Sequence, residues 1–444
     1  MVNIVIDNGA HTIKAGVQKG LPRIIPNAVI RSKGDKATYF GHEFERCSDY
    51  SSLHYRLPLE KGYIVDWDAQ KAIWDGIFST EVFNVDTTEA SLLLTEPYFN
   101  LPNVQDVYDQ LVFEEYEFQS YFRCTSASLI PHGSLFKRPR QPRPECCIVV
   151  DSGFSYTHIV PIMENRVVWN AVKRVDVGGK LLTNQLKELV SYRQWNMMDE
   201  TFIVNDVKEK CCFVSQDFKR DLEICRGNAA QNSIVQDYIL PDLSRNQKGR
   251  VRTPDDMGLD TDQVLVMNNE RFVVPEILFR PDDIGELLVS RRGMFWANIG
   301  LIGGNTKLPG FRERLLQELQ PLAQMGTEII IYESTDPILE PYRSALHFNF
   351  TRHAVTRAEY QEIGSEASRR KFQSVHQPPA GASADHGSPD TDASPEPTQK
   401  CSNRGKKPTD EKGGSGSAKA STSAKPARAA GTRHSTREVG SRKK

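Results

Sequence analysis

Two short segments combine an aspartate with a nearby glycine, and this combination could bind a phosphate group. The first segment runs from Asp7 to Gly9 and the second from Asp151 to Gly153. A glycine-bearing turn can present backbone N–H groups to an anion, and each aspartate could face a hydrated metal ion. Lys14 follows the first segment and could neutralise the charge of a phosphate. A single motif of this kind usually only forms a turn. It indicates a phosphate site only when other glycine-bearing segments occur with it.

A third segment, residues 299–311, contains the adjacent glycines Gly303 and Gly304 and leads into a predicted helix. Paired glycines let the backbone approach a ligand closely, and the N-terminus of a helix favours anions. Three glycine-bearing segments in this order, the first two of one type, together predict a cleft that could hold a nucleotide.

Each aspartate segment lies between two apolar runs. Val2–Ile6 and Thr12–Val17 flank the first segment, whereas Cys147–Val150 and Thr157–Val160 flank the second. Both arrangements are typical of a β-hairpin with a tight, glycine-bearing turn. The repetition predicts two similar halves that face each other.

Apolar residues recur at helical spacing between the strand-like runs, in Asp68–Phe78, Leu181–Val190 and Phe311–Leu319. Strands that alternate with helices predict an α/β fold with layered architecture. The proline-rich segment Lys137–Pro144 predicts an exposed linker. Whether its basic residues form a nuclear-import signal or only a solvated loop stays open.

The charge of the chain is unevenly distributed. Residues 1–372 carry 43 Lys and Arg against 50 Asp and Glu, whereas residues 373–444 carry 13 against 7. The basic tail has no Leu, Ile, Phe, Tyr, Trp or Met, so it cannot bury enough apolar surface to offset its chain entropy, and disorder is predicted. An acidic body favours protein partners over direct binding of nucleic acid by the body.

Cysteine usage and hydropathy predict a protein of a reducing compartment. None of the eight cysteines forms a Cys-x-x-Cys pair, so reduced thiols are expected rather than a zinc site. The first residues enter a strand at once, which argues against a secretory signal. No apolar stretch approaches the roughly 20 residues that span a bilayer, so no membrane association is expected.

The three glycine-bearing segments resemble the nucleotide loops of actin. Residues 7–16 are similar to its first phosphate loop, residues 151–158 to its second, and residues 303–310 to its adenosine-side loop. Further stretches resemble actin at Leu57–Asp68, Leu93–Glu96, Asp206–Lys210, Asn269–Glu276 and Arg370–Phe372.

The resemblance covers nearly all of residues 1–372 and implies an actin-like, two-lobed α/β fold with a duplicated core, the architecture shared with Hsp70 and sugar kinases. It implies a first lobe from residues 1–144, completed by about 332–372, and a second lobe from residues 145–331. Residues 373–444 remain as the predicted tail.

The same resemblance implies ATP or ADP with Mg²⁺ as the ligand of the cleft, although the cleft is partly degraded. Lys208 and Glu209 match positions that contact the adenosine ribose in actin, with a solvated helix face as the alternative. The candidate ligand-binding residues are Asp7, Gly9, Lys14, Asp151, Gly153, Lys208, Glu209, Gly303 and Gly304. No catalytic residue and no protein metal ligand is assigned.

Several positions depart from actin. Ala10 and His11 stand where actin has Ser and Gly, and Phe154 replaces an Asp. Thr125 stands near the place of the glutamine that positions water, and threonine is too short for that role. Hydrolysis of an anhydride needs a positioned water and charge stabilisation. We therefore expect hydrolysis to be weak or lost, and the chain not to act as an enzyme.

Two further departures concern assembly and the adenine pocket. The segment Arg31–Lys36 is short and charged, where actin has a longer apolar loop that docks onto the next subunit of a filament. Glu340–Ser344 stands where actin has Trp-x-Gly-Gly, which leaves the form of the adenine pocket open.

Among actin-related proteins, the chain is most similar to the nuclear sixth class, through Tyr39–Glu43 and through Asp151–Phe154 running into His158–Pro161. That class implies a scaffold subunit of a Swr-type chromatin remodeller, which exchanges a variant histone into nucleosomes. The implied partners are the remodeller ATPase subunit, a small zinc-finger subunit and other remodeller subunits, with histones or nucleosomes contacted indirectly. The implied location is the nucleus, with the cytoplasm as a second location. A cytoskeletal actin relative and an ATP-hydrolysing enzyme are the alternatives.

Overall fold

The computed structural model describes residues 2–18, 20–50, 53–228, 232–241, 248–253, 262–280 and 293–376. Its last helix, α12 (Glu366–His376), continues past Phe372, where the sequence predicts the folded body to end. The rest of the predicted disordered tail, from residue 377 onward, lies outside the described residues.

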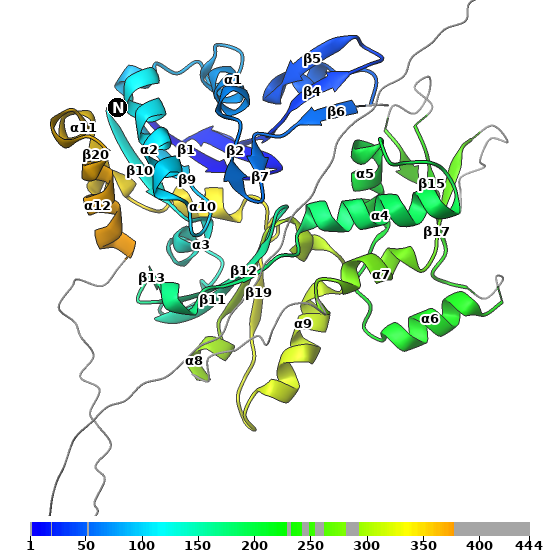
Figure 1. The fold of residues 1–444 in the computed structure, drawn as a ribbon. Helices are drawn as coiled ribbons and strands as arrows, with labels where there is room; N and C mark the ends of the chain where they lie inside the picture. The colour runs from blue at the N-terminus through cyan, green and yellow to red at the C-terminus, as the bar shows by residue number, and fades with distance from the viewer. Residues whose placement is uncertain are drawn as a thin grey trace, which may run out of the picture. The chain divides into compact units, whose positions relative to one another are not determined.

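A six-stranded sheet forms the centre of the first lobe (Figure 1). Its strands in spatial order are β20 (Val355–Thr356), β10 (Ser120–Cys124), β9 (Ala90–Thr95), β1 (Val2–Asn8), β2 (Thr12–Val17) and β3 (Arg23–Pro26). Strands β1 and β2 form the predicted antiparallel hairpin, whereas β9 and β10 extend the sheet parallel to β1. All six residues of β9 are buried, as expected for a parallel strand covered on both faces.

A second sheet repeats this pattern and defines the second lobe. It runs β13 (Arg166–Val167), β12 (Thr157–Met163), β11 (Cys146–Ser152), β18 (Ile299–Ile302) and β19 (Ile331–Glu333), and β14 (Lys173–Val175) also pairs with β12. Strands β11 and β12 form the second predicted hairpin, and β18 and β19 continue in parallel. The second sheet ends with β19 at Glu333, close to residue 331, where the sequence predicts the second lobe to end.

The registers of the two hairpins place the aspartates at matching positions. Asp7 of β1 lies opposite Lys14 of β2, and Asp151 of β11 lies opposite His158 of β12. Both carboxylates therefore stand beside the turn of their hairpin, where parallel strands of the same sheet also end.

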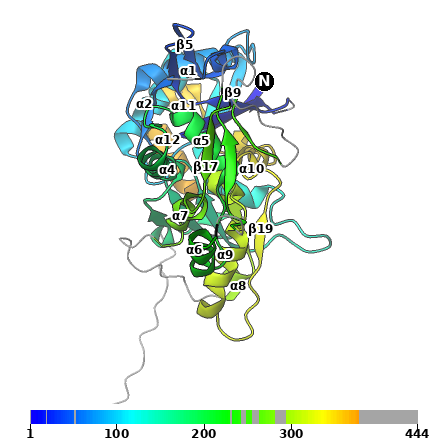
Figure 2. The ribbon, with the colours of Figure 1, turned by 90° about the vertical axis from the view of Figure 1, so that its right-hand side faces the viewer.

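The three predicted helices form close to their predicted bounds, as α1 (Trp67–Phe78), α4 (Gly179–Arg193) and α9 (Phe311–Leu319). The Asp66 side chain caps α1 by accepting the N–H of Ala69 at 3.1 Å. The view in Figure 2 shows α4 in front, and this helix packs on α5 and α7. The remaining helices are α2 (Pro102–Gln110), α3 (Ser126–Leu129), α5 (Thr201–Cys211), α6 (Phe218–Arg226), α7 (Glu270–Glu276), α8 (Gly293–Trp296), α10 (Glu340–Ala345) and α11 (Arg357–Ile363).

Three smaller sheets complete the described elements. They contain β4 (Val29–Ser32), β5 (Ala37–Phe40) and β6 (Leu53–Arg56); β7 (Leu59–Glu60) and β8 (Tyr63–Ile64); and β15 (Gln236–Ile239), β16 (Arg250–Val251) and β17 (Val264–Met267). The charged segment Arg31–Lys36 forms the tip of the β4–β5 hairpin. The Asp35 carboxylate in this tip accepts hydrogen bonds from the Tyr39 hydroxyl at 2.9 Å and from the Ser48 N–H at 3.0 Å. The tip is therefore tied back onto its own lobe.

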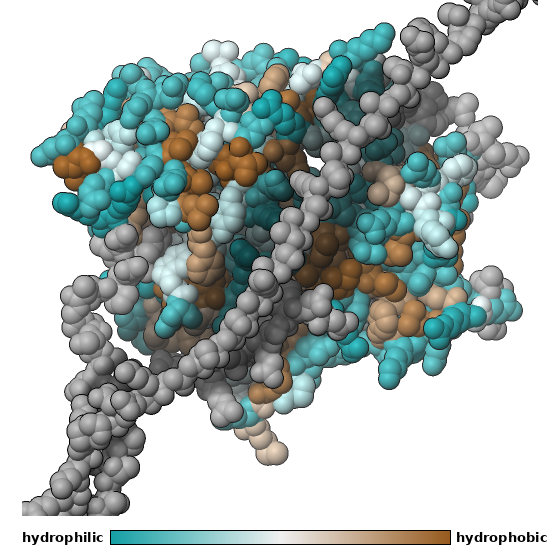
Figure 3. All heavy atoms as spheres, in the orientation of Figure 1, coloured by the Kyte–Doolittle hydropathy of each residue, from teal (hydrophilic) through white to brown (hydrophobic). Residues whose placement is uncertain are grey.

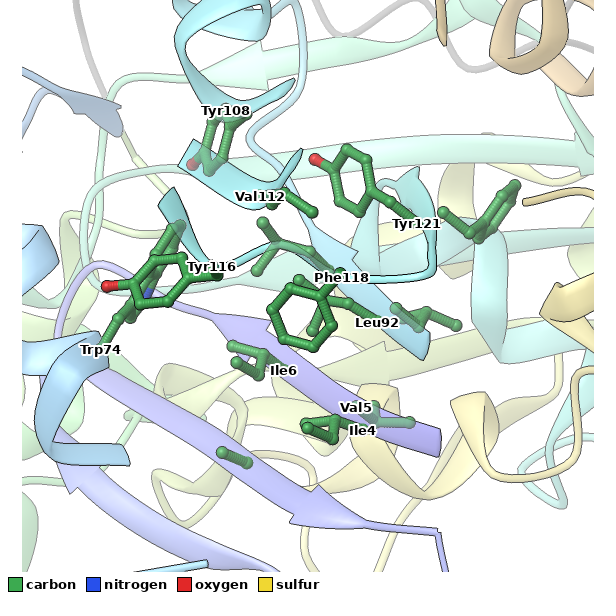
Figure 4. Packing of buried hydrophobic residues seen from close by; sticks show 14 of the residues in the cluster. Ile4, Val5, Ile6, Trp74, Leu92, Tyr108, Val112, Tyr116, Phe118 and Tyr121 are labelled. Atoms are coloured by element: carbon green, nitrogen blue, oxygen red, sulfur yellow. The ribbon is translucent and has the colours of Figure 1, made fainter. Parts of the chain in front are cut away.

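The first lobe has a dense aromatic core (Figure 4). Strand β1 contributes Ile4, Val5 and Ile6, each at most 1% exposed. The aromatic side chains of Trp74, Tyr108, Tyr116, Phe118 and Tyr121 surround them, as do Tyr342, Phe350 and Phe372 from the C-terminal part of the chain. A separate core lies in the second lobe and contains Leu182, Leu186, Val204, Val207 and Leu301.

The surface and the cysteines bear on the sequence predictions. On the face shown in Figure 3, hydrophobic side chains gather in separate patches among larger hydrophilic areas. Among the described cysteines, six are buried and Cys225 is partly buried, with no disulfide between them, which confirms the predicted thiols; Cys401 lies outside the described residues. No helix in the described part of the chain has the length and apolar character needed to cross a bilayer. The predicted linker Lys137–Pro144 is irregular and mostly exposed, as expected.

Candidate nucleotide cleft

A cavity of about 440 Å³ lies where the two hairpin turns meet the loop after β18 and the helix α5. All nine residues proposed from the sequence line it: Asp7, Gly9, Lys14, Asp151, Gly153, Lys208, Glu209, Gly303 and Gly304. The fold thus brings together residues from four segments that are far apart in the sequence. Their individual contacts decide what the cavity can hold.

Asp7 is the centre of a polar network on the first turn. One carboxylate oxygen accepts the hydroxyls of Thr95 at 2.8 Å and Ser126 at 3.0 Å, and the other forms an ion pair with the Lys14 amine at 3.1 Å. Gly9 is required in this turn, because a Cβ atom there would lie 2.7 Å from the Thr12 carbonyl oxygen. The lysine expected to meet a phosphate is thus held by a carboxylate of its own hairpin.

Asp151 occupies the corresponding place on the second turn, but no cation pairs with it among the described residues. Its Oδ2 accepts the hydroxyl of Tyr98 at 3.0 Å, and that hydroxyl in turn accepts the N–H of Ala127 at 3.1 Å. Burial raises the pKa of the Asp151 carboxyl to about 6, and the charge of Asp7 adds to the rise, whereas Tyr98 and Lys14 oppose it. Two similar hairpins therefore hold two aspartates in different electrostatic settings.

The loop after β18 is joined to the second turn by Asn305. The Asn305 side-chain amide donates to the Gly153 carbonyl at 2.8 Å and to the Ser152 hydroxyl at 3.1 Å. Gly303 has a φ of 92°, and a Cβ atom there would lie 2.3 Å from the Ser152 carbonyl oxygen, so only glycine fits. The glycine pair thus serves close packing of two backbone segments.

Lys208 and Glu209 behave differently although they are neighbours on α5. Lys208 is 5% exposed, and its amine donates to the Asn205 side chain at 2.8 Å, the Thr183 hydroxyl at 3.0 Å and the Gly179 carbonyl at 3.3 Å. Burial lowers its pKa. Glu209 is exposed and accepts from Asn205 at 2.8 Å. The alternative of a solvated helix face is thus wrong for Lys208 and fits Glu209.

Three of the residues that depart from actin, Ala10, His11 and Phe154, also line the cleft. The ring of His11, after the first turn, stacks on the ring of Phe154, after the second, with centroids 4.8 Å apart and planes 23° apart. The His11 side chain is exposed to the cavity. Its partial desolvation, together with the charges of Lys208 and Lys14, lowers the pKa of the imidazole to about 4. The pair is neutral at physiological pH and bridges the two turns.

Thr125 does not face the cavity. It is 2% exposed, its hydroxyl has no hydrogen-bond partner among the described residues, and it is absent from the cavity lining, unlike its neighbour Ser126. Glu340–Ser344 forms most of α10, and Tyr342 is fully buried beneath β2, where its hydroxyl fills the space over Gly16. Pro337, Ile338 and Pro341 give this end of the cavity an apolar wall.

The two lobes meet at a second place, on their rims. Phe202 of α5 stacks on Tyr50 of the first lobe at 5.0 Å between ring centroids and packs edge-on against Phe44 at 5.7 Å. These side chains extend a small hydrophobic cluster that includes Ile30 and Leu53. We call the rings of Phe44, Tyr50 and Phe202 the rim cluster.

Sequence reasoning missed several residues that shape the site, namely Thr95, Tyr98, Ser126, Asn305, Pro337 and Ile338. Thr95 and Tyr98 follow the end of a buried parallel strand, a position where ligands commonly bind. Their position at the end of a buried parallel strand could have identified them as candidate site residues. Nothing local marks Asn305, because its partners belong to a hairpin distant in the sequence.

A nucleotide with its phosphates between the two turns does not fit the observed arrangement. The His11–Phe154 stack occupies that place, Lys14 is paired with Asp7, and the N–H groups of Gly9 and Gly153 donate to the carbonyls of Asp7 and Tyr156. Among the described residues, no group of three or more His, Cys, Asp or Glu side chains could hold a metal ion. We therefore derive no step through a bound nucleotide or metal.

Two facing sheets of one topology, with matched hairpin turns at a shared cavity, define an actin-type fold. The family described as Actin matches residues 1–294 and 289–373. An Actin-like protein ARP6 of Cryptococcus neoformans is 46% identical, over 84% of this chain and 85% of its own length. The Actin-related protein 6 of Arabidopsis thaliana is 37% identical, over 83% and 99%, and that of Drosophila melanogaster is 34% identical, over 84% and 98%. The chain belongs to the actin-related protein 6 family.

Proposed function

We propose that this protein is a non-filamentous nuclear scaffold subunit of a chromatin-remodelling complex that exchanges a variant histone into nucleosomes. The observation that carries the proposal is the state of the cleft. Its frame is intact, but the position that would hold the water-positioning residue belongs to Thr125, which is buried outside the cavity. The cleft thus retains its fold but lacks a side chain that could position water for hydrolysis. This combination favours a scaffold over an enzyme.

The β4–β5 hairpin supports the non-filamentous part of the proposal. A filament contact at this place would need an apolar loop that extends from the lobe. Here the tip is charged, and Asp35 ties it to Tyr39 and Ser48. Exposing an apolar contact would break these hydrogen bonds and leave charged side chains at the interface, which costs free energy.

The resemblance to the sixth class of actin-related proteins supplies the complex and the partners. The proposed partners are the remodeller ATPase subunit and a small zinc-finger subunit, together with other remodeller subunits. Histones and nucleosomes are then contacted indirectly. The acidic body, with 50 Asp and Glu against 43 Lys and Arg, complements basic partner segments. Obligate interfaces usually bury more than about 2,000 Å², so we expect the chain to be stable with these partners and poorly behaved alone.

Purification of the tagged chain from nuclear extract, followed by quantitative mass spectrometry, tests the proposal. We expect remodeller subunits at near-equal stoichiometry, retained at moderate salt, and absent from a mock purification of the same extract without the tagged chain. Recovery of only cytoplasmic motor or capping proteins would support the cytoskeletal alternative and overturn the proposal.

A further inference from the structure

We propose that His11 and Phe154 form a ring gate, which excludes nucleoside polyphosphates from the space between the two hairpin turns. The ring gate thus determines which ligands the cleft accepts: the phosphate end is closed, and only a ligand without a polyphosphate fits the remaining cavity. The inference deepens the proposed non-catalytic role of the same cleft.

The stacked rings of His11 and Phe154 obstruct a phosphate sterically. The two ring centroids are 4.8 Å apart and the planes are nearly parallel, so the rings touch and leave no room for a phosphate between them. One ring follows the turn after β1 and the other follows the turn after β11. A polyphosphate held by both turns would have to separate the rings. Aromatic pairs of this kind are worth about two- to tenfold in an equilibrium constant, so their separation weakens binding by at least that factor.

A phosphate between the turns would need hydrogen-bond donors and cations, and three backbone donors at the turns already have partners within the protein. The N–H of Asn8 donates to Thr95, that of Gly9 to Asp7, and that of Gly153 to Tyr156. These bonds hold the turns in their present form, and a phosphate would compete with each of them.

Two lysines of the cavity are already engaged by groups of the protein. Lys14 is paired with Asp7 at 3.1 Å, and Lys208 is held by three oxygen acceptors of the second lobe. Glu96 and Asp151 also line the cavity, so a polyphosphate would meet their carboxylates as well as the cations Lys61, Arg174 and Lys307, which line it too. The neutral His11 ring adds no positive charge, since its pKa is lowered to about 4.

The other end of the cavity has a different character. Pro337, Ile338 and Pro341 form an apolar wall there, and the Ile338 side chain lies close to Gly304. A flat apolar group with a few polar atoms suits such a surface, as most small-molecule sites are apolar with few polar anchors. The ring gate therefore separates a closed phosphate end from an open apolar end.

Titration of the full-length chain with ATP and Mg²⁺ by calorimetry tests the ring gate. Three variants are compared with the wild type: His11→Gly, Phe154→Gly and the double variant. Phe99→Gly is the matched control, because Phe99 also packs on an aromatic ring, Trp169, but lies outside the cavity lining. Its φ of 56° is one that glycine adopts readily.

We expect the double variant to bind ATP at least about tenfold more tightly than the wild type, whereas Phe99→Gly behaves as the wild type. Adding Lys14→Ala to the double variant should remove the gained affinity, because it removes the cation nearest the first turn. Equal affinity of the wild type and a folded double variant would overturn the inference.

The wild type provides a test that does not depend on the variants. A ligand that binds the folded state raises the melting temperature, and we expect ATP with Mg²⁺ to leave it unchanged. A clear rise with ATP would overturn the ring gate even if the double variant failed to fold. Such a result would not affect the scaffold proposal, which the purification of partners decides.

Discussion

Replacing Asp151 by asparagine is expected to stabilise the protein at neutral pH. Burial raises the pKa of this carboxyl from 3.8 to about 6, so the fold prefers its protonated form. Well below pH 4 the group is protonated in both the folded and the unfolded chain and costs nothing. As the pH rises from about 4 to about 6, the unfolded chain gives up this proton while the folded chain retains it, so stability is lost. Above about pH 6 the folded chain holds a buried carboxylate and the loss stays constant.

The size of the effect follows from the pKa difference. Each unit corresponds to about 1.4 kcal/mol, so a rise of about two units costs on the order of 3 kcal/mol above pH 7. The cavity admits some solvent to Asp151, which reduces the expected gain in Asp151→Asn to about 2–3 kcal/mol. The asparagine oxygen can still accept the hydroxyl of Tyr98, so no hydrogen bond need be lost.

Urea unfolding of both proteins between pH 5 and pH 8, followed by tryptophan fluorescence, measures this difference. We expect the stability advantage of Asp151→Asn to be about half of its full size at pH 5 and to reach its full size at about pH 7. Asp7→Asn is the matched control in the same cavity, and it should destabilise, because it leaves Lys14 without its partner. An Asp151→Asn protein that is no more stable than the wild type at pH 8, or an advantage independent of pH, would refute the reasoning.

Four other predictions follow from the described contacts. Single-turnover assays should show phosphate release at background, because Thr125 lies outside the cavity; robust release that Asp151→Ala abolishes would mean that the cleft is catalytic. Sedimentation at high protein concentration with magnesium and salt should yield no pellet of regular filaments, because the β4–β5 tip is tied down. Phe202→Ala should lower the free energy of unfolding by about 1–2 kcal/mol, since it removes the centre of the rim cluster, whereas Tyr192→Ala, at a side chain 93% exposed, should change it by less than about 0.5 kcal/mol. Deletion of residues 377–444 should leave the melting temperature unchanged, because Phe372 is the last core residue in the described part of the chain; a large fall would contradict this.

The positions of the backbone turns could be predicted from the sequence because they depend on local patterns. An apolar run that ends in aspartate and glycine and is followed by a second run specifies a hairpin, and both hairpins form as expected. Since both belong to one type of sheet, the sequence also predicts that Asp7 and Asp151 face a common cleft, and both line it.

Side-chain directions could not be predicted in the same way. Lys208 belongs to a helix with polar neighbours, yet its amine turns inward to Gly179 and Thr183, because the N-terminal end of α4 packs beside α5. The inward position of Thr125 and the contact of His11 with Phe154 likewise depend on how distant segments meet. The local sequence does not show which distant segments come into contact.

The sheet of the first lobe is closed by the end of the chain, and this has a consequence for biosynthesis. Strand β20 pairs with β10, and Tyr342, Phe350 and Phe372 complete the core around β1. The second lobe, in contrast, draws its sheet from one uninterrupted stretch that ends at Glu333. On the ribosome the later lobe can therefore finish its sheet at Glu333, before the residues that complete the core of the earlier lobe have been made. Part of the apolar core of the first lobe thus stays uncovered until the segment that ends at Phe372 leaves the ribosome.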